Sequence, residues 1–352
     1  GSSVTIYPQE RLYGEKTVIV DKSIRNENGT RLDKTTEYIV AMEALKPEVK
    51  ILGNGVIMPD SKGLVLPFKS VSLRAVDVLV YKIYSDNIMQ FFQYNSYAGQ
   101  NQLRYVGRPV YRKMVRLDEN PATNLQQWNA FSVDLTGMIS NDNNAMYRVE
   151  IAFRKDYSLY DCGDEKTAGL EKYDDLQLMS DDEQEYFDGT DSYFYDYPSN
   201  YSWRDRDNPC SNSYYISSRF PERNLLASNL GVIAKSADGR HFTVAVTNLL
   251  NTSPVISADL EFFNLQQQKI GDGVTGSDGM ATISLDETPY IIRAGRDGRQ
   301  SWLRVDDGSS LSVSNFDVAG QKISDGIKGN IYGERGVWRP GDTLFLTFVM
   351  DD

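Results

Sequence analysis

The stretch that most constrains the fold, residues 328–348, has the pattern of two strands joined by a shaped turn. An extended run reaches Tyr332, and the glycines after it allow positive φ around a charged tip. Arg339-Pro-Gly-Asp342 has turn chemistry, because Pro presets φ at the first central position and Gly accepts positive φ at the second. Apolar residues then alternate with smaller or polar ones, as in a half-buried strand: Leu344, Leu346 and Phe348. Spacing alone therefore predicts a hairpin.

Composition extends this β interpretation to the whole chain. A length of 352 residues suggests two or three domains, and 40% hydrophobic residues are enough to build their cores. The 27 glycines and 22 tyrosines are typical of turns and strands, and no long segment has helical periodicity. We therefore predict an all-β, multidomain chain.

Two stretches predict β-sandwiches. In residues 48–155, the run Val76–Ile83 is almost continuously apolar, as a strand covered on both faces would be. For residues 87–95 a strand and a short helix both remain open. Residues 225–318 hold about seven short strand patterns separated by turns, enough for a second sandwich. Residues 4–47 add further strands around an Asn28-Gly29 turn.

An acidic, aromatic insertion interrupts the first sandwich at residues 156–222. We expect it to be partly mobile near 164–190 and then ordered by aromatic side chains. In a strand, Arg204 and Arg206 would share one face, and we expect them to pair with acidic groups of the insertion. Its aromatic residues are a candidate interaction surface for carbohydrate or protein: Tyr193, Tyr195, Tyr197, Tyr201, Trp203, Tyr214 and Tyr215.

The only two cysteines, Cys162 and Cys210, are expected to form a disulfide, which implies an oxidising compartment. The alternative is two separate buried thiols. A bridge closing about 50 residues would contribute roughly 4 kcal/mol in the chain-entropy model.

Charge and residue types exclude several functions. A net charge of −12 argues against nucleic-acid partners and against attraction to anionic lipid. No apolar run approaches the ~18 residues of a spanning helix, so any membrane attachment is expected from an anchor outside this sequence. The single histidine, His241, fits a strand-edge surface position better than a hydrolase site. We expect no catalytic residues, no cofactor and no metal site, with calcium at the acidic residues as the weaker alternative.

The run from Tyr332 to Thr343, YGERGVWRPGDT, resembles the signature that opens a macroglobulin-like domain in the alpha-2-macroglobulin family. Residues 203–210 and 224–234 are similar to the bacterial branch of that family. The resemblance implies consecutive macroglobulin-like antiparallel β-sandwiches, of immunoglobulin- or fibronectin-like type. The signature residues are Tyr332, Arg335, Gly336, Trp338, Arg339, Pro340 and Gly341.

The expected domains are a C-terminal remnant of an immunoglobulin-like domain (1–47), a sandwich carrying the insertion (48–224), a second sandwich (225–320) and the start of a third (321–352). The resemblance implies a structural, non-enzymatic N-terminal fragment of a broad-range endopeptidase inhibitor, periplasmic or at the cell surface, and an outer-membrane lipoprotein in full-length form.

In that family a protease cuts a bait segment and becomes trapped, often with help from an internal thioester. The partners would be target proteases, met by the full-length protein, and further macroglobulin-like domains of the same chain. Cys162-Gly-Asp-Glu165 ends in Glu where a thioester needs Gln, so we expect no thioester there. The alternative is a cell-surface β-sandwich array that binds carbohydrate or protein.

Overall fold

The computed structural model describes residues 14–26, 28–42, 44–53, 57–58, 64–139, 144–163, 169–189, 197–198, 200–236, 238–305, 328–333 and 346–351, with Thr5, Tyr7, Pro8 and Leu12. It divides into two units, residues 1–305 and 306–352, and each is described by itself. The regular secondary structure of the described residues is mostly strands of antiparallel sheets with little helix, as the all-β prediction requires.

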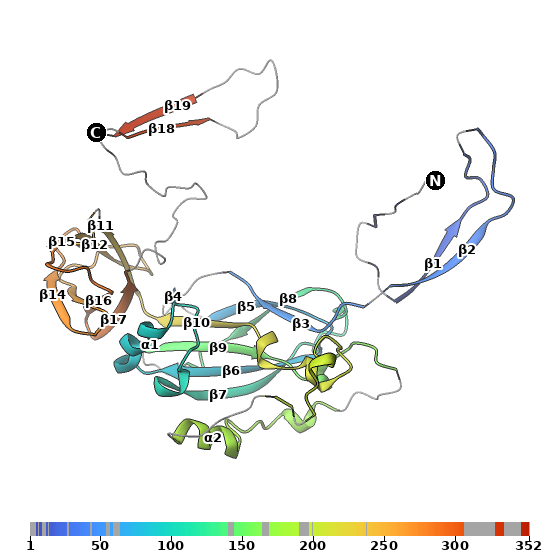
Figure 1. Ribbon diagram of the computed structural model, residues 1–352, viewed down its shortest axis with the longest axis horizontal. Helices are drawn as coiled ribbons and strands as arrows, with labels where there is room; N and C mark the ends of the chain where they lie inside the picture. Colours follow the sequence, from blue (N-terminus) through green and yellow to red (C-terminus); the bar gives the residue numbers. More distant parts are fainter. Residues whose placement is uncertain are drawn as a thin grey trace. The chain divides into compact units, whose positions relative to one another are not determined.

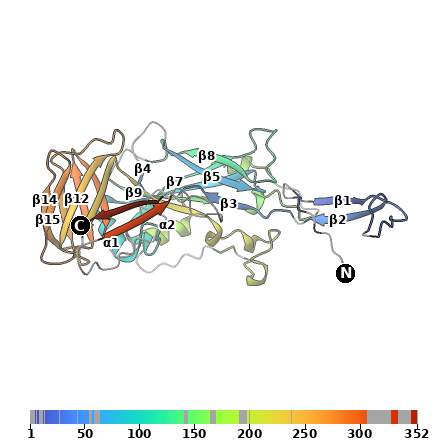
Figure 2. The ribbon, with the colours of Figure 1, turned by 90° about the horizontal axis from the view of Figure 1, so that it is seen from above.

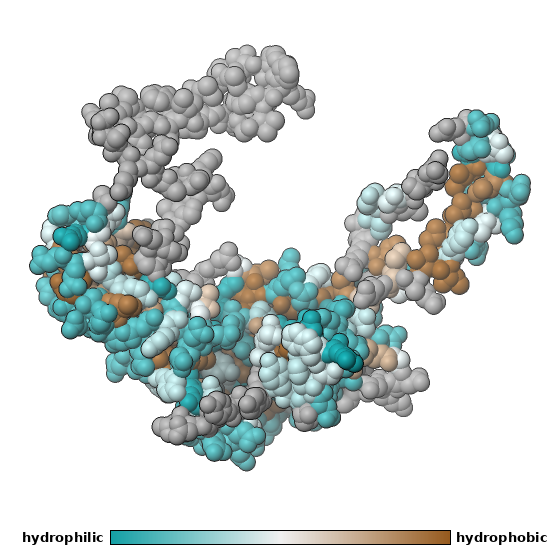
Figure 3. Space-filling model, in the orientation of Figure 1, coloured by the Kyte–Doolittle hydropathy of each residue, from teal (hydrophilic) through white to brown (hydrophobic). Residues whose placement is uncertain are grey.

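The first two strands, β1 (Gly14–Val20) and β2 (Thr36–Met42), form an antiparallel hairpin with Val18 opposite Tyr38. The side-chain oxygen of Asn26 accepts hydrogen bonds from the backbone amides of Asn28 and Thr30, so the predicted turn lies in the connection between the strands. Figure 3 shows brown, hydrophobic surface along this hairpin. Large apolar or aromatic side chains are exposed in it: Ile19, Ile24, Leu32, Tyr38 and Ile39. A hairpin of two strands is marginally stable alone. That residues 1–47 are the remnant of a larger domain stays a prediction.

Two sheets build the first sandwich. The five-stranded sheet has the order β4-β10-β9-β6-β7, and the three-stranded sheet has the order β3-β5-β8. Figure 2 shows the ribbon from above, with β5 and β8 of the three-stranded sheet labelled. Among the described strands of these two sheets, only the short β4–β10 pair is parallel. The strands are β3 (Glu48–Ile51), β4 (Ile57–Met58), β5 (Val65–Val71), β6 (Ala75–Ile83), β7 (Gly107–Arg116), β8 (Asn129–Asp134), β9 (Met146–Ala152) and β10 (Glu222–Ala227).

The two-residue period of β6 and β9 explains how this sandwich is filled. Alternate residues of β6 point into the core between the sheets: Val76, Val78 and Val80. The residues between them face the other side, where the insertion covers the sheet: Asp77, Leu79 and Tyr81. β9 repeats the pattern, with Tyr147, Val149 and Ile151 in the core. The prediction that β6 is covered on both faces is confirmed.

The second sandwich has the seven strands that the sequence predicts. One sheet is β11-β12-β15 and the other is β14-β13-β16-β17. Their bounds are β11 (Leu230–Ser236), β12 (His241–Asn248), β13 (Asp259–Phe263), β14 (Lys269–Val274), β15 (Met280–Ser284), β16 (Ile291–Arg296) and β17 (Arg299–Arg304). The core between them includes Val244, Val246, Leu260, Phe262 and Ile292, all fully buried.

A third apolar cluster joins the two sandwiches. The run 87–95, left open between strand and helix, contains the helix α1 (Ile88–Tyr94), preceded by the 3₁₀ turn η1 (Ser85–Asn87). Phe91 and Phe92 of α1 pack in one buried cluster with Ile291 and Trp302 of the second sandwich. The hydroxyl of Tyr290 donates to the backbone oxygen of Phe92 at 2.6 Å. We call this contact the junction.

The second unit contains one described hairpin. β18 (Lys328–Gly333) pairs antiparallel with β19 (Leu346–Asp351), and Tyr332 lies opposite Thr347. These strands follow the predicted strand–turn–strand pattern. The other signature residues lie outside the described residues: Arg335, Gly336, Trp338, Arg339, Pro340 and Gly341. The predicted domain boundaries stay predictions.

Candidate functional site

The insertion departs after β9 and returns at β10, and these strands are neighbours in the five-stranded sheet. Residues 153–221 therefore form one long excursion between paired strands, drawn in green to yellow in Figure 1. Its elements are η3 (Lys155–Tyr157), η4 (Glu171–Tyr173), the helix α2 (Asp181–Asp188), η5 (Trp203–Asp205), η6 (Asn212–Tyr214) and η7 (Ser217–Arg219). Residues of η3, η4, α2 and η6 lie over the face of the sheet that points away from the sandwich core, where they line a cavity with it.

Helix α2 lies within the segment that the sequence analysis expected to be partly mobile. Its N-terminus is a capping box: the Ser180 hydroxyl accepts from the Glu183 amide at 3.2 Å, and the Glu183 carboxylate accepts from the Ser180 amide at 2.7 Å. Three acidic residues in the first turn also suit the positive end of the helix dipole. The pattern Ser-x-x-Glu was the signal in the sequence that could have identified this helix.

Arginines beside and within β7 hold α2. Arg112 makes two hydrogen bonds to Glu183, at 3.1 and 2.7 Å, and both side chains are only 14% exposed. Arg108 pairs with Asp188 at 2.6 Å in a more exposed position. Arg104, in η2 (Leu103–Tyr105), places its guanidinium 4.8 Å from the centre of the Tyr186 ring.

These contacts set the protonation of Glu183. Burial alone would raise the pKa of its carboxyl group, but the hydrogen bonds from Arg112 and from the Ser180 amide outweigh burial and lower that pKa below its ordinary value. Glu183 is therefore a carboxylate near neutral pH, and its ion pair with Arg112 fixes α2 against β7.

The sequence analysis expected Arg204 and Arg206 to pair with acidic groups of the insertion, and Arg206 does so, with an ion pair to Asp207 at 3.7 Å. Trp203–Asp205 is a 3₁₀ helix, so the prediction of a strand with Arg204 and Arg206 on one face is wrong. Arg206 packs on the Trp203 ring at 3.9 Å and lies near its neighbour Asp207. Short polar segments with Asp and Asn favour local turns, and this local preference prevailed over the alternating pattern.

A buried carboxylate lies beneath the insertion. Asp77 of β6 accepts a hydrogen bond from the Tyr157 hydroxyl at 2.6 Å and from Arg154 Nε at 2.5 Å. Burial, followed by the Asp77 charge, raises the pKa of Tyr157 far above its ordinary value, so the tyrosine stays a hydrogen-bond donor. Both carboxylate oxygens are occupied, which makes the group a fixed anchor for the start of the insertion.

Between sheet and insertion lies a cavity of about 510 Å³, whose walls include Asp77, Tyr81, Arg112, Glu150, Tyr173 and Glu183. Two of its carboxylates, Asp77 and Glu183, are bonded to arginines. Acid–base hydrolysis needs one carboxyl group held protonated beside an ionised one, whereas in this cavity burial is outweighed by hydrogen bonds, which lower the pKa of both Asp156 and Glu183. Within the described parts of the chain, no cluster of three His, Cys, Asp or Glu could hold a metal ion.

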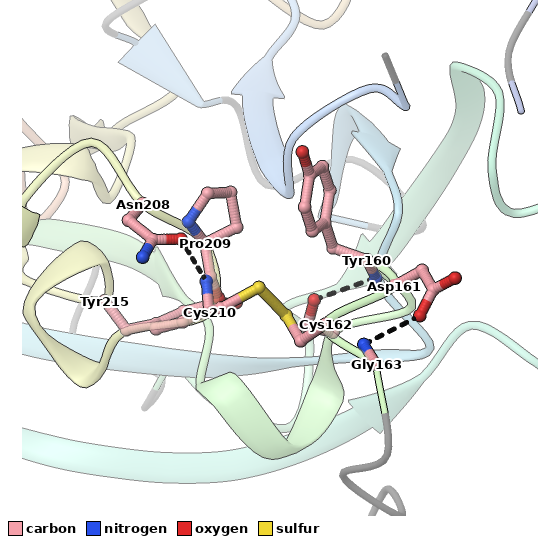
Figure 4. The surroundings of a disulfide bond; sticks show 9 residues. Tyr160, Asp161, Cys162, Gly163, Asn208, Pro209, Cys210 and Tyr215 are labelled. Atoms are coloured by element: carbon pink, nitrogen blue, oxygen red, sulfur yellow. Dashed lines mark hydrogen bonds between the residues drawn. A yellow bond between two sulfur atoms is a disulfide. The ribbon is translucent and has the colours of Figure 1, made fainter. Parts of the chain in front are cut away.

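The disulfide ties the insertion together. Cys162 and Cys210 are bonded, with Cα atoms 5.5 Å apart, as the sequence analysis expected (Figure 4). Asn208 accepts from the Cys210 amide at 3.0 Å, and Tyr215 donates its hydroxyl hydrogen to the backbone oxygen of Pro209 at 2.7 Å. The bridge thus joins the start of the insertion to the segment that leads back to the sheet.

The predicted interaction residues divide into two groups. Tyr214 and Tyr215 are anchors: Tyr214 is buried and donates to the Pro47 oxygen, and Tyr215 packs edge-on against Phe153. Burial raises the pKa of Tyr215 to about 12. Tyr193 and Tyr195 lie outside the described residues.

Of the remaining candidate aromatics, Tyr197 and Trp203 are exposed and Tyr201 is half-buried. Tyr197 and Tyr201 pack with ring centres 4.6 Å apart, and Trp203 is 67% exposed. His241 begins β12, is exposed, and bonds through Nδ1 to Asp238 at 2.5 Å. That agrees with the surface position expected for it.

Comparison with known proteins assigns the fold. Residues 227–323 match the family model described as the bacterial alpha-2-macroglobulin MG3 domain. A crystal structure of native alpha-2-macroglobulin from Escherichia coli, spanning domains MG0, NIE and MG1, aligns with 84% of this chain and 76% of its own at a TM-score of 0.50 and 16% identity. Residues 227–323 are a macroglobulin-like domain of the bacterial alpha-2-macroglobulin family.

Two longer alpha-2-macroglobulin structures also align with this chain, each over 17% of its own length. This chain aligns over 96% of its length with the cryo-EM structure of the native Escherichia coli protein, at 18% identity and a TM-score of 0.47, and spans 17% of that chain. It aligns similarly with a Salmonella alpha-2-macroglobulin mutant, over 97% of this chain and 17% of the other, at 16% identity and a TM-score of 0.45. No curated protein sequence matches it.

The described residues bear on two further expectations, the absence of a thioester at Cys162 and the absence of a spanning helix. Cys162, the one cysteine followed by a thioester-like string, is held in the disulfide. None of the helices among the described residues is long and apolar enough to cross a membrane.

Proposed function

We propose that this chain is an architectural part of a bacterial alpha-2-macroglobulin-like inhibitor whose full-length form traps endopeptidases. The match of residues 227–323 to the MG3 domain of that family carries the proposal. The chain itself would be non-enzymatic, and its partners would be further macroglobulin-like domains of the same protein and, through the whole molecule, the trapped protease.

The junction supports an architectural role. Phe91 and Phe92 of α1 share a buried cluster with Trp302. One hydrogen bond is donated from each sandwich to the other, by the hydroxyl groups of Tyr97 and Tyr290. Tightly packed apolar contacts resist deformation, so the two sandwiches would move as one body. A trap that rearranges after cleavage needs such rigid parts between its moving ones.

The location is part of the same proposal: the periplasm or the cell surface, as part of an outer-membrane lipoprotein. The Cys162–Cys210 disulfide supports an oxidising compartment, because disulfides persist there and are rare in reducing cytosol.

The test is to incubate the full-length parent protein with a panel of endopeptidases. Trapping predicts one specific cleavage, a mobility shift of the intact complex, and loss of activity towards large substrates while small substrates are still cleaved. Small-substrate activity is the internal control, because active-site inhibition would abolish both. General degradation of the parent without protection would refute trapping and leave the alternative, a surface array that binds carbohydrate or protein.

A further inference from the structure

A second cavity, of about 260 Å³, lies beside α1 on the first sandwich, apart from the cavity under the insertion. Its walls come from α1, from the loop that follows, and from η2: Gln90, Phe91, Tyr94, Asn101, Gln102 and Tyr105. The volume is just below the ~300 Å³ at which typical small-molecule pockets begin, so it suits a small ligand or one unit of a larger one.

Two tyrosines offer their rings to the solvent at this pocket. Tyr94 is 64% exposed and Tyr105 is 52% exposed. Arg104 fixes the second ring, because it donates to the Tyr105 hydroxyl at 2.8 Å and lies 4.8 Å from the ring centre. Arg104 also stacks on Tyr186 of α2, so Tyr105 is held in place before any ligand arrives.

The loop between α1 and η2 is built around a buried asparagine. Asn95 donates to the backbone oxygens of Phe91 and Asn101, both at 2.9 Å, and accepts from the Asn101 amide at 2.7 Å. The next residue, Gln102, has φ of 60° and ψ of 25°, in the left-handed region that non-glycine residues rarely occupy. Gln267, in the turn between β13 and β14, has a similar φ of 66°, so this conformation by itself describes the turn; what it does here is fix the backbone from which the Gln102 side chain extends at the pocket.

The amides at the pocket are available for a ligand. Across the described residues, the side chains of Gln90 and Gln102 make no hydrogen bond within the protein. Each amide presents a donor and an acceptor side by side. No lining residue carries a charge, so the pocket favours a neutral ligand.

We propose that this pocket binds a neutral saccharide. A sugar ring has an apolar face of C–H groups, which would pack on Tyr94 or Tyr105, and a rim of hydroxyl groups, which would bond to the amides of Gln90, Asn101 and Gln102. The site is distinct from the aromatic residues of the insertion that the sequence analysis favoured for carbohydrate. It also does not depend on protease trapping.

The test titrates the full chain with cellotriose, maltotriose and tri-N-acetylchitotriose by calorimetry and by saturation-transfer NMR. We expect at least one trisaccharide to bind with a dissociation constant of about 1 mM or lower, and Tyr94→Ala and Tyr105→Ala each to weaken it about tenfold. Gln102→Gly tests the amide separately, because glycine retains the left-handed backbone while removing the side chain; we expect several-fold weaker binding and an unchanged unfolding temperature.

Trp203→Ala is the matched control, since it removes an equally exposed aromatic ring from the insertion. It should leave the affinity unchanged. Three results would overturn the proposal: no binding of any of the three sugars, binding lost in Trp203→Ala but not in Tyr94→Ala, or a proline-rich peptide binding at this pocket where the sugars do not.

Discussion

The first sandwich is covered by apolar contacts where it meets the second sandwich and by ion pairs where it meets helix α2 of the insertion. At the junction, Phe92 and Trp302 are buried in an apolar cluster, and hydrogen bonds from Tyr97 and Tyr290 to backbone oxygens complete the contact. At the insertion, arginine–carboxylate pairs hold α2 over a polar cavity. Apolar burial is insensitive to salt and pH, whereas ion pairs respond to both. The junction is thus suited to a permanent joint, and the insertion to a contact that conditions can loosen.

The strongest test of this contrast removes an apolar side chain from the junction. Phe92→Ala should lower the free energy of unfolding by about 3–5 kcal/mol, because it leaves a cavity in a fully buried cluster. Calorimetry should then show the two sandwiches unfolding in separate transitions. Phe262→Ala is the control: it is equally buried in the second sandwich core and should destabilise that sandwich without removing junction contacts. A loss below about 1 kcal/mol for Phe92→Ala would contradict a tightly packed joint.

A smaller effect is expected at the insertion. Arg112→Ala should cost about 2 kcal/mol, because it leaves the Glu183 carboxylate mostly buried without its main partner. Arg108→Ala, which breaks a more exposed pair with Asp188, should cost less than about 1 kcal/mol. Urea unfolding gives both values, and limited proteolysis should detect release of α2 in the first variant. Equal costs for the two variants would show that burial of the pair is unimportant.

The smallest predicted effect is a dependence on acid. Glu183 has a lowered pKa in the folded protein, so its contribution to stability is fully present above its ordinary pKa of 4.5 and is lost as the pH falls through the lowered value. Amide hydrogen exchange of α2 should therefore speed up, relative to that of α1 at the junction, as the pH is taken progressively below 4.5. Glu183→Gln should remove this dependence. The same acid response in the glutamine variant would assign it to other groups.

The sandwiches were predictable because their information is local and periodic. The alternation of Tyr147, Val149 and Ile151 identifies a strand and its buried face directly, and the apolar run Val76–Ile83 indicates cover on both faces. Even the disulfide followed from a count of two cysteines.

The contacts of the insertion were not predictable in the same way. Arg112 pairs with Glu183, which is 71 residues away in the sequence. No local pattern in either segment predicts that these two side chains are partners. The acidic run suggested mobility, although Ser180 and Glu183 already carried a capping signal. Tyr214 and Tyr215 differ from exposed Tyr197 only in what the fold packs against them. Side chains whose role depends on distant partners need the structure.

The Cys162–Cys210 bridge has a consequence for how the first sandwich folds. Strands β9 and β10 must find each other across residues 153–221, a slow search for a flexible chain. Once the bridge has formed, the connecting path is only residues 153–162 and 210–221, about a third as long. The entropic free-energy cost of closing the loop between β9 and β10 falls by about 1 kcal/mol. If the bridge forms before the strands pair, β9 and β10 would meet roughly five-fold faster. Formation of the Cys162–Cys210 bridge would then limit the rate at which β9 and β10 pair, although the five-stranded sheet contains neither cysteine.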